Sequence, residues 1–489
     1  MATATEKIAE RSNRFIQCII VNHCIDGCSE SLIRIFGDGM NARQKALIAI
    51  GLLLVLGGGI YFAANRAIDR VVRADGFLRF ISGKTAQKLN ASECGYLPAA
   101  RNGMSVQSAG ILVRGRPPHH LTELNAINIH AYCSLENLWQ RKFTIRRLRA
   151  SQLQAAYGEA AASQLQKILP AEPNLEPRDD TEPVLHIDIH ETDIDRTDVY
   201  WGADAENVGG LKAVSSRFFP KDHGLDIFGR GGTFQQTGWP ELKVDDLHLN
   251  WTRSRLLVNS AYLSLGAPRN FIVTGQLKFG EHASMQFHLS AKQAPAEPLI
   301  TGYWKGKFNG VVDSETDLNK QFEPDAKVNA TGNLNFTRAS VHDVQALKQI
   351  AVVTRHPQFE KPKIDILRFH YRYTGNRLEV SKFEAETKGL CRLEGDFSLE
   401  NKNIDGSFKI GVAPDVVETL PGAREEVFTE SRDGYLWTTL NLEGPASHPR
   451  EDLKQRLVAA AQKHFAKGIL APLFKTGKPL IDVLEEIYK

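Results

Sequence analysis

The chain has 489 residues, of which 42% are hydrophobic and 24% charged, values typical of a folded protein. Its formal net charge of +3 is small for this length, which argues against a nucleic-acid partner. Six cysteines do not predict a disulfide framework, and the sequence leaves open whether Cys94 and Cys133 are joined. Short alternating runs separated by turn residues dominate residues 180–445, so we expect a mainly β protein.

Residues 1–39 form a leader that differs from the rest of the chain. A start at Met40 would place a short basic region directly before an apolar run, so we expect the leader not to be translated. The alternative is a short amphipathic extension around Phe15 to Ile20. Cys24 and Cys28 resemble half of a zinc site, but no second cysteine pair follows at a suitable distance.

An uncharged run from Ala46 to Ala64, 19 residues long, could span a bilayer as a helix. Basic residues flank it on both sides, so the charges do not decide its orientation. Because a cleaved signal peptide has a shorter apolar region, we expect residues 40–73 to form an uncleaved anchor.

The rest of the chain divides by its periodicity. Residues 74–160 predict an α+β unit, with a strand from Asn125 to Tyr132, and a Pro- and acid-rich linker covers 161–183. Residues 184–445 predict a repetitive β domain, with a helical stretch near Val341 to Thr354. Leu453, Leu457 and Ala460 then recur at helical spacing, so residues 446–489 predict amphipathic helices that either cover the end of the sheet or contact a membrane.

One β-pattern occurs twice, in residues 243–290 and 363–410. Val244-Asp245 corresponds to Ile364-Asp365, and Gly275 to Gly395, at an offset of 120 residues. Apolar residues alternate with polar ones in both copies, which indicates strands with one apolar and one solvated face. Repetition of a multi-strand unit predicts one extended sheet whose apolar face needs a cover.

That apolar face is the candidate functional surface. Successive strands would offer near-equal places for acyl chains, with head groups left in water and with no catalytic residue, metal or cofactor. The alternative is the dry core of a sandwich or barrel, which shows the same alternation. The residues expected to line the face are Leu247, Leu249, Trp251, Phe271, Val273, Leu367, Phe369, Tyr371, Leu393 and Phe397.

The order of these features resembles the AsmA-like family of bacterial envelope proteins. A basic flank, one anchor and the pattern from Ile127 to Leu148 are similar to the family's start, and residues 377–383, 391–399 and 404–410 are similar to its C-terminal meander. The resemblance covers most of residues 40–445. It implies an inner-membrane protein with its bulk in the periplasm and a curved, taco-like apolar groove. It also implies kinship with bridge-like lipid-transfer proteins and a role in moving phospholipids toward the outer membrane.

Other motifs are weak. His186, Asp188 and His190 would share one face of a strand, but Ile187 and Ile189 make the opposite face apolar, so we expect a solvated strand and no metal site. The chain carries no Gly-x-Ser-x-Gly or His-Glu-x-x-His motif, so we expect no enzyme, although an envelope hydrolase stays a third alternative.

Together these features predict a membrane-anchored periplasmic protein with a long curved antiparallel sheet, short helices and a helical C-terminal cap. We expect it to hold phospholipid acyl chains for lipid transport or envelope biogenesis. The alternative function is a structural or interaction protein of the inner membrane that has a dry β core and envelope-protein partners.

Overall fold

The computed structural model describes residues 66, 75–115, 121–134, 142–181, 186–202, 204–221, 223–280, 282–323, 325–446 and 449–466. The chain separates into two compact units, and the second, Asp75–Lys489, carries the fold described below. The leader, the predicted anchor from Ala46 to Ala64, and Cys18, Cys24 and Cys28 lie outside the described residues. Among the helices that the structure does describe, none has both the length and the apolar character needed to cross a bilayer.

The second unit is built around one large sheet with few helices, which confirms the mainly β prediction. Helix α4 (Asp75–Lys88) packs against the first strands, and its Ala86 contributes to a small core with Cys94 and Val113. This part comprises β1 (Glu93–Tyr96), β2 (Ala99–Asn102), β3 (Ser105–Arg114), β4 (Leu121–Ser134), β5 (Lys142–Tyr157), α5 (Glu159–Ala162), β6 (Glu176–Pro177), β7 (His186–Ile189) and β8 (Thr192–Trp201).

The predicted linker 161–183 does not interrupt the sheet. Glu176 and Pro177 pair with β1, and β8 then runs parallel to β5, so the sheet continues from one predicted domain into the next. The pairing of β5 with β7 and β8 is parallel, whereas every other described pairing is antiparallel. Cys94 and Cys133 are free thiols, so the disulfide that the sequence left open is not formed.

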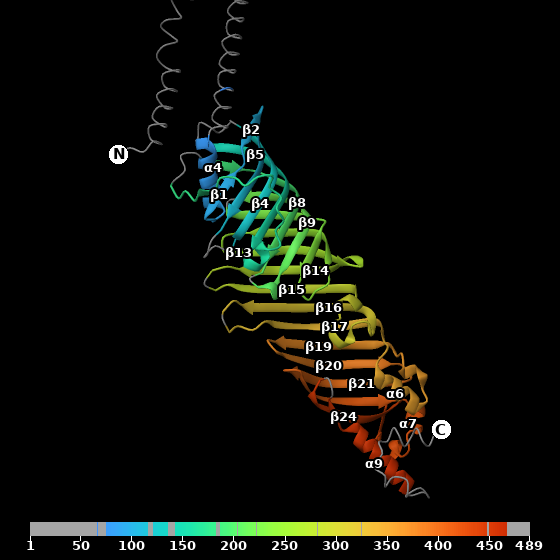
Figure 1. Ribbon diagram of the computed structural model, residues 1–489. Coiled ribbons are helices and arrows are strands. Elements are labelled where there is room, and N and C mark those ends of the chain that lie inside the picture. Colours follow the sequence, from blue (N-terminus) through green and yellow to red (C-terminus); the bar gives the residue numbers. More distant parts are fainter. Residues whose placement is uncertain are drawn as a thin grey trace, which may run out of the picture. The chain divides into compact units, whose positions relative to one another are not determined.

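The sheet continues strand by strand to the end of the described chain (Figure 1). Each strand pairs with its predecessor or its near neighbour in sequence, as a meander. The strands are β9 (Gly209–Lys221), β10 (Gly224–Arg230), β11 (Thr233–Gln236), β12 (Leu242–Trp251), β13 (Arg255–Leu265), β14 (Ala267–Lys278), β15 (Ser284–Pro295), β16 (Phe308–Gln321), β17 (Asn329–Val341), β18 (Lys363–Ile364), β19 (Ile366–Thr374), β20 (Arg377–Thr387), β21 (Cys391–Glu400), β22 (Asn403–Val412), β23 (Glu430–Arg432), β24 (Tyr435–Pro445) and β25 (Arg450–Glu451).

The sequence repeat corresponds to two four-strand meanders. The first copy falls on β12–β15 and the second on β19–β22, with β16 and β17 between them. Equivalent aspartates make equivalent contacts: Asp245 accepts the backbone N–H of Arg269 (2.8 Å), and Asp365 accepts that of Lys388 (2.8 Å). Each bond ties the start of the first strand of a copy to the region where the second strand passes into the third: Arg269 is the third residue of β14, and Lys388 lies between β20 and β21.

β-Bulges interrupt several strands, and aspartate side chains accept hydrogen bonds from the backbone of the bulged residues. At four of them, a non-glycine residue with left-handed φ donates its backbone N–H to an aspartate, on the adjacent strand in three cases and two strands away in the case of Arg269 and Asp245. A bulge adds local twist to a strand, so these anchored bulges set the coiling of the sheet. The pairs are Ala213–Asp198, Arg269–Asp245, Gln293–Asp313 and Lys382–Asp396.

Short helices lie along one margin of the sheet, where β15, β17 and β22 end (Figure 1). Val344 and Leu347, at the start of α6, pack with Ala296, Phe308 and Ala339. These connections comprise η3 (Glu297–Leu299), η4 (Gly302–Trp304), α6 (Gln345–Thr354), η5 (Pro357–Phe359), α7 (Pro414–Glu418) and α8 (Ala423–Glu426); η2 (Ala205–Asn207) precedes β9. The predicted helix near Val341 to Thr354 is therefore observed, four residues shorter at its start.

Helix α9 (Leu453–Ala466) closes the last edge of the sheet. Its Leu453, Leu457 and Ala460 pack against α7 and α8, in agreement with a covering role; residues 467–489 lie outside the described part. Asp452 accepts the backbone N–H of Asn441 (2.9 Å), and Arg456 donates to the carbonyl of Thr439. These side chains satisfy backbone groups of β24 that would otherwise be open to another strand.

We therefore predict that the double substitution Asp452→Ala/Arg456→Ala exposes the edge of β24 and causes concentration-dependent self-association, measured by sedimentation velocity. Lys454→Ala, on the same helix, is the control because its side chain does not reach β24. A double variant that stays as monodisperse as the control would show that the edge is protected in another way.

Candidate functional site

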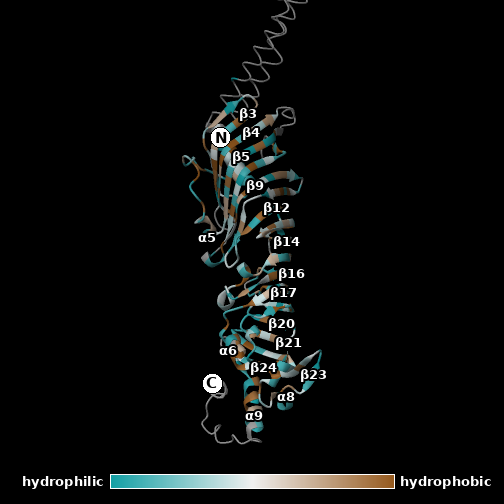
Figure 2. Ribbon diagram, turned by 90° about the vertical axis from the view of Figure 1, so that its right-hand side faces the viewer, coloured by the Kyte–Doolittle hydropathy of each residue, from teal (hydrophilic) through white to brown (hydrophobic). Residues whose placement is uncertain are grey.

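One mostly apolar face runs through both copies of the repeat and the strands between them. The register places residues from successive strands in one cross-strand row, directly opposite one another, so they share a face. From β12 to β24 the row reads Leu247, Ala261, Val273, Leu289, Thr316, Gly332, Tyr371, Val380, Phe397, Gly406 and Leu442. Figure 2 shows the matching alternation of apolar and polar residues along the strands.

All the residues predicted to line this face belong to it. Leu247, Val273, Tyr371 and Phe397 are in the row itself. The others lie on the same face, two or four residues along the strand from the row residue. They are Leu249, Trp251, Phe271, Leu367, Phe369 and Leu393. The period-two alternation therefore predicted correctly that these side chains share one face. It did not predict what covers that face.

The face is covered along one margin and half-exposed beyond it. Near the margin of η3 and α6, Val244, Phe271 and Val312 are buried and Leu299 packs over them. Further toward the hairpin turns, residues such as Leu249 and Phe369 are only partly buried, and Trp251 and Tyr373 are 38% and 37% exposed. The facing side chains of a sandwich core would be shielded throughout. In the first copy, Trp251 meets the ring of Tyr157 on β5, with centroids 6.3 Å apart, so the curled sheet partly faces itself there.

Aromatic rings form a ladder across the second copy. Phe336 and Phe369 have centroids 6.3 Å apart, and Phe369 and Phe383 6.0 Å apart, one ring from each successive strand. Phe397 and Phe408 extend the ladder at 5.8 Å. Such pairs stabilise neighbouring strands and also give the face a continuous surface of carbon atoms.

Glycines let these rings lie flat on the sheet. A Cβ at Gly395 would be 2.4 Å from the carbonyl oxygen of Ser407 and 2.8 Å from the ring of Phe408. The equivalent Gly275 would meet the ring of Phe287 at 2.7 Å. The equivalence of Gly275 and Gly395 in the sequence repeat thus has a structural cause, since each accommodates a neighbouring aromatic ring.

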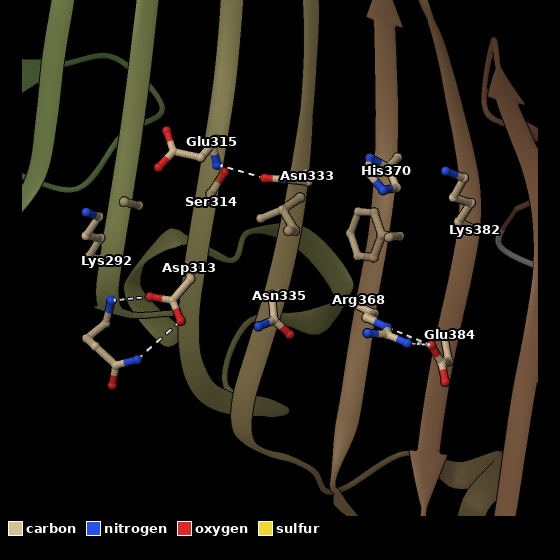
Figure 3. A pocket seen from close by; sticks show the side chains of 14 residues that line it. Lys292, Asp313, Ser314, Glu315, Asn333, Asn335, Arg368, His370, Lys382 and Glu384 are labelled. Atoms are coloured by element: carbon tan, nitrogen blue, oxygen red, sulfur yellow. Dashed lines mark hydrogen bonds and ion pairs between the residues drawn. The ribbon is translucent and has the colours of Figure 1, made fainter.

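The opposite face is polar and carries a hollow of about 720 Å³ across β15–β20 (Figure 3). Its carboxylates already have partners: Asp313 accepts from Gln293, and Glu384 pairs with Arg368 (2.6 Å) and Arg392 (2.7 Å). The lining residues are Ala291, Lys292, Gln293, Asp313, Ser314, Glu315, Asn333, Leu334, Asn335, Arg368, Phe369, His370, Lys382 and Glu384; of these, Ser314, Leu334 and Phe369 belong to the apolar face by register. This internal pairing is what a solvated sheet face requires.

The polar face also holds a histidine between two carboxylates. His288 Nδ1 is 2.8 Å from Asp317, and its Nε2 is 2.9 Å from Glu315. Ser290 donates to Glu315 (2.7 Å) rather than to the imidazole, so the cluster lacks the serine-to-histidine contact that activates a nucleophile. The hydrogen bond to Asp317, supported by that to Glu315, raises the pKa of His288.

The motif His186–His190 lies on β7 and the residue after it, with His190 3.5 Å from Asp188. Nothing is described of the His186 side chain. In the part of the chain that the structure describes, no group of three or more His, Cys, Asp or Glu side chains is arranged to hold a metal ion.

The aspartates that anchor the bulges and the paired charges of the polar face have no recognisable signal in the sequence. The offset of Asp245 and Asp365 was visible in the repeat, but their backbone partners lie 24 and 23 residues later and have no motif of their own.

No protein-family model, curated protein or solved structure matches the chain. The resemblance to the AsmA-like family therefore stays a prediction.

Because the raised pKa stabilises the imidazolium form, we predict that His288 contributes stability below its ordinary pKa of about 6.5 and loses it as the pH rises through the folded-state value. His288→Gln should therefore lower the free energy of unfolding more at acidic than at alkaline pH, as measured by denaturant titration. His370→Gln, which makes no ion pair in the structure, is the control. Equal effects of His288→Gln at both pH values would contradict this account.

Proposed function

We propose that the chain is a membrane-anchored protein of the bacterial envelope whose apolar sheet face holds lipid acyl chains. Its role would be lipid transport or outer-membrane biogenesis. The observation that carries the proposal is the mostly apolar row from Leu247 to Leu442, in which Val273, Leu289, Phe397 and Leu442 are only partly buried. In this proposal the coiled sheet forms a groove around the chains, and residues 46–64 anchor it in the inner membrane with its bulk in the periplasm.

The energetics favour acyl chains as the occupant. Each methylene removed from water contributes about 0.8 kcal/mol, so a sixteen-carbon chain laid along the face gains on the order of 10 kcal/mol. Because neighbouring strands present similar side chains about 4.8 Å apart, a chain could move from one strand to the next at small net cost. Transport along the groove then needs no catalytic group.

The competing function is a structural protein whose apolar face is closed by a protein partner. The partial exposure of Leu249, Phe369 and Phe397 is compatible with either occupant, but the face runs through both copies of the repeat. Protein interfaces concentrate their binding energy in a few buried residues, whereas this surface repeats apolar side chains on many successive strands. This repetition favours a sliding ligand.

Phe369→Asp places a charge on the apolar face and should reduce the lipid that co-purifies with the full chain by at least about tenfold, because an unpaired carboxylate disfavours contact with hydrocarbon. His370→Asp is the matched control, since it introduces the same charge at the next residue, on the polar face. Lipid bound per chain is measured by native mass spectrometry and extraction. A lipid-free but stable wild-type chain, or equal loss in both variants, would contradict the proposal.

A further inference from the structure

A strip of hydroxyl groups interrupts the apolar face at the junction between the two copies. On β16 the residues that share the face with Val312 and Leu318 are Ser314 and Thr316. In the same cross-strand row, the neighbours on β15 and β20 are Leu289 and Val380. The polar groups are therefore flanked by apolar surface on both sides.

Tyr371 on β19 completes this strip by reaching across β17. Its hydroxyl is 2.7 Å from Thr316 Oγ1, and Thr316 Oγ1 is 3.2 Å from Ser314 Oγ. Gly332, directly between Thr316 and Tyr371 in the register, makes this reach feasible. A Cβ there would lie 3.0 Å from both the Tyr371 ring and Thr316 Oγ1. We call Ser314, Thr316 and Tyr371 the hydroxyl seam.

The hydroxyl seam has one donor more than it uses. Each of the three hydroxyls carries one O–H donor, and the two hydrogen bonds among them consume two. Among the described residues the third O–H has no hydrogen-bond partner, and all three side chains are half-buried rather than enclosed. A donor is therefore left for a ligand that lies on the face.

The chemistry of the seam selects an uncharged acceptor. Burial raises the pKa of Tyr371, against a smaller opposing effect of its hydrogen bond to Thr316, so the phenol stays protonated and able to donate. Among the side chains that share this face on β16, the charged one is Lys320, four residues beyond Thr316 and opposite Met285. Carbonyl oxygens fit a neutral donor flanked by hydrocarbon.

We propose that the hydroxyl seam binds the ester or amide carbonyl at the root of an acyl chain, and so provides a place where a lipid pauses between the two copies of the repeat. This inference rests on the proposed function and adds a substrate class to it: lipids whose chains are attached through a carbonyl group. Chains without such a carbonyl would pass the seam with one O–H donor left without a partner.

The test offers the full chain an equimolar mixture of two lipids with the same head group and chain length, one ester-linked and the other ether-linked. Mass spectrometry gives the ratio in which the chain retains them. We expect the wild type to favour the ester-linked lipid by about two- to tenfold, the range of one net hydrogen bond. Tyr371→Phe and Thr316→Val, which keep the shape of each side chain, should bring the ratio close to one.

Tyr373→Phe is the matched control, because Tyr373 is on the same strand and face but has no hydroxyl partner in the structure. It should keep the wild-type ratio. Equal retention of both lipids by the wild type, or an unchanged ratio in Tyr371→Phe, would overturn the role of the seam while leaving the lipid face in place. Retention of neither lipid would overturn the proposed function and, with it, this inference.

Discussion

An amphipathic sheet has to shield its apolar face from water, and this constraint organises the whole second unit. Sandwiches meet it with a second sheet, and barrels meet it by closure. Here the margin helices shield the rows nearest to them, as Val244 and Val312 show, while rows nearer the hairpin turns stay half-exposed. The polar face needs no cover because its carboxylates and guanidinium groups are paired with each other. In the described part of the chain, the surface left partly exposed is thus a mostly hydrocarbon strip that the hydroxyl seam interrupts.

The same constraint explains why the last strand and the sides of the sheet are protected in different ways. The last strand is a hazard because its backbone groups could pair with another chain, and α9 meets this with Asp452 and Arg456. Along the sides, bulges held by aspartates twist the strands, and glycines such as Gly275 and Gly395 keep aromatic rings close to the backbone. Stability comes from the backbone ladder, the rings and these anchors, so the exposed apolar strip remains available for another role.

Much of this architecture could be predicted from the sequence, because period-two alternation fixes which side chains share a face. The repeat identified β12–β15 and β19–β22, and the predicted lining residues all fall on one face. Prediction failed where contacts span long sequence distances. The parallel pairing of β5 with β8, across the segment taken for a linker, had no local signal. Nor did the hydroxyl seam, because Thr316 and Tyr371 are 55 residues apart.

The central claim, that the half-exposed strip is covered by lipid, is tested most directly by photo-crosslinking in intact cells. Benzoylphenylalanine would replace Phe397, on the apolar face, and separately Ser398, its neighbour on the polar face, and adducts on the purified chain would be identified by mass spectrometry. We expect lipid adducts at position 397 and none above background at position 398. Protein adducts at 397, or no adduct at either position, would contradict the account.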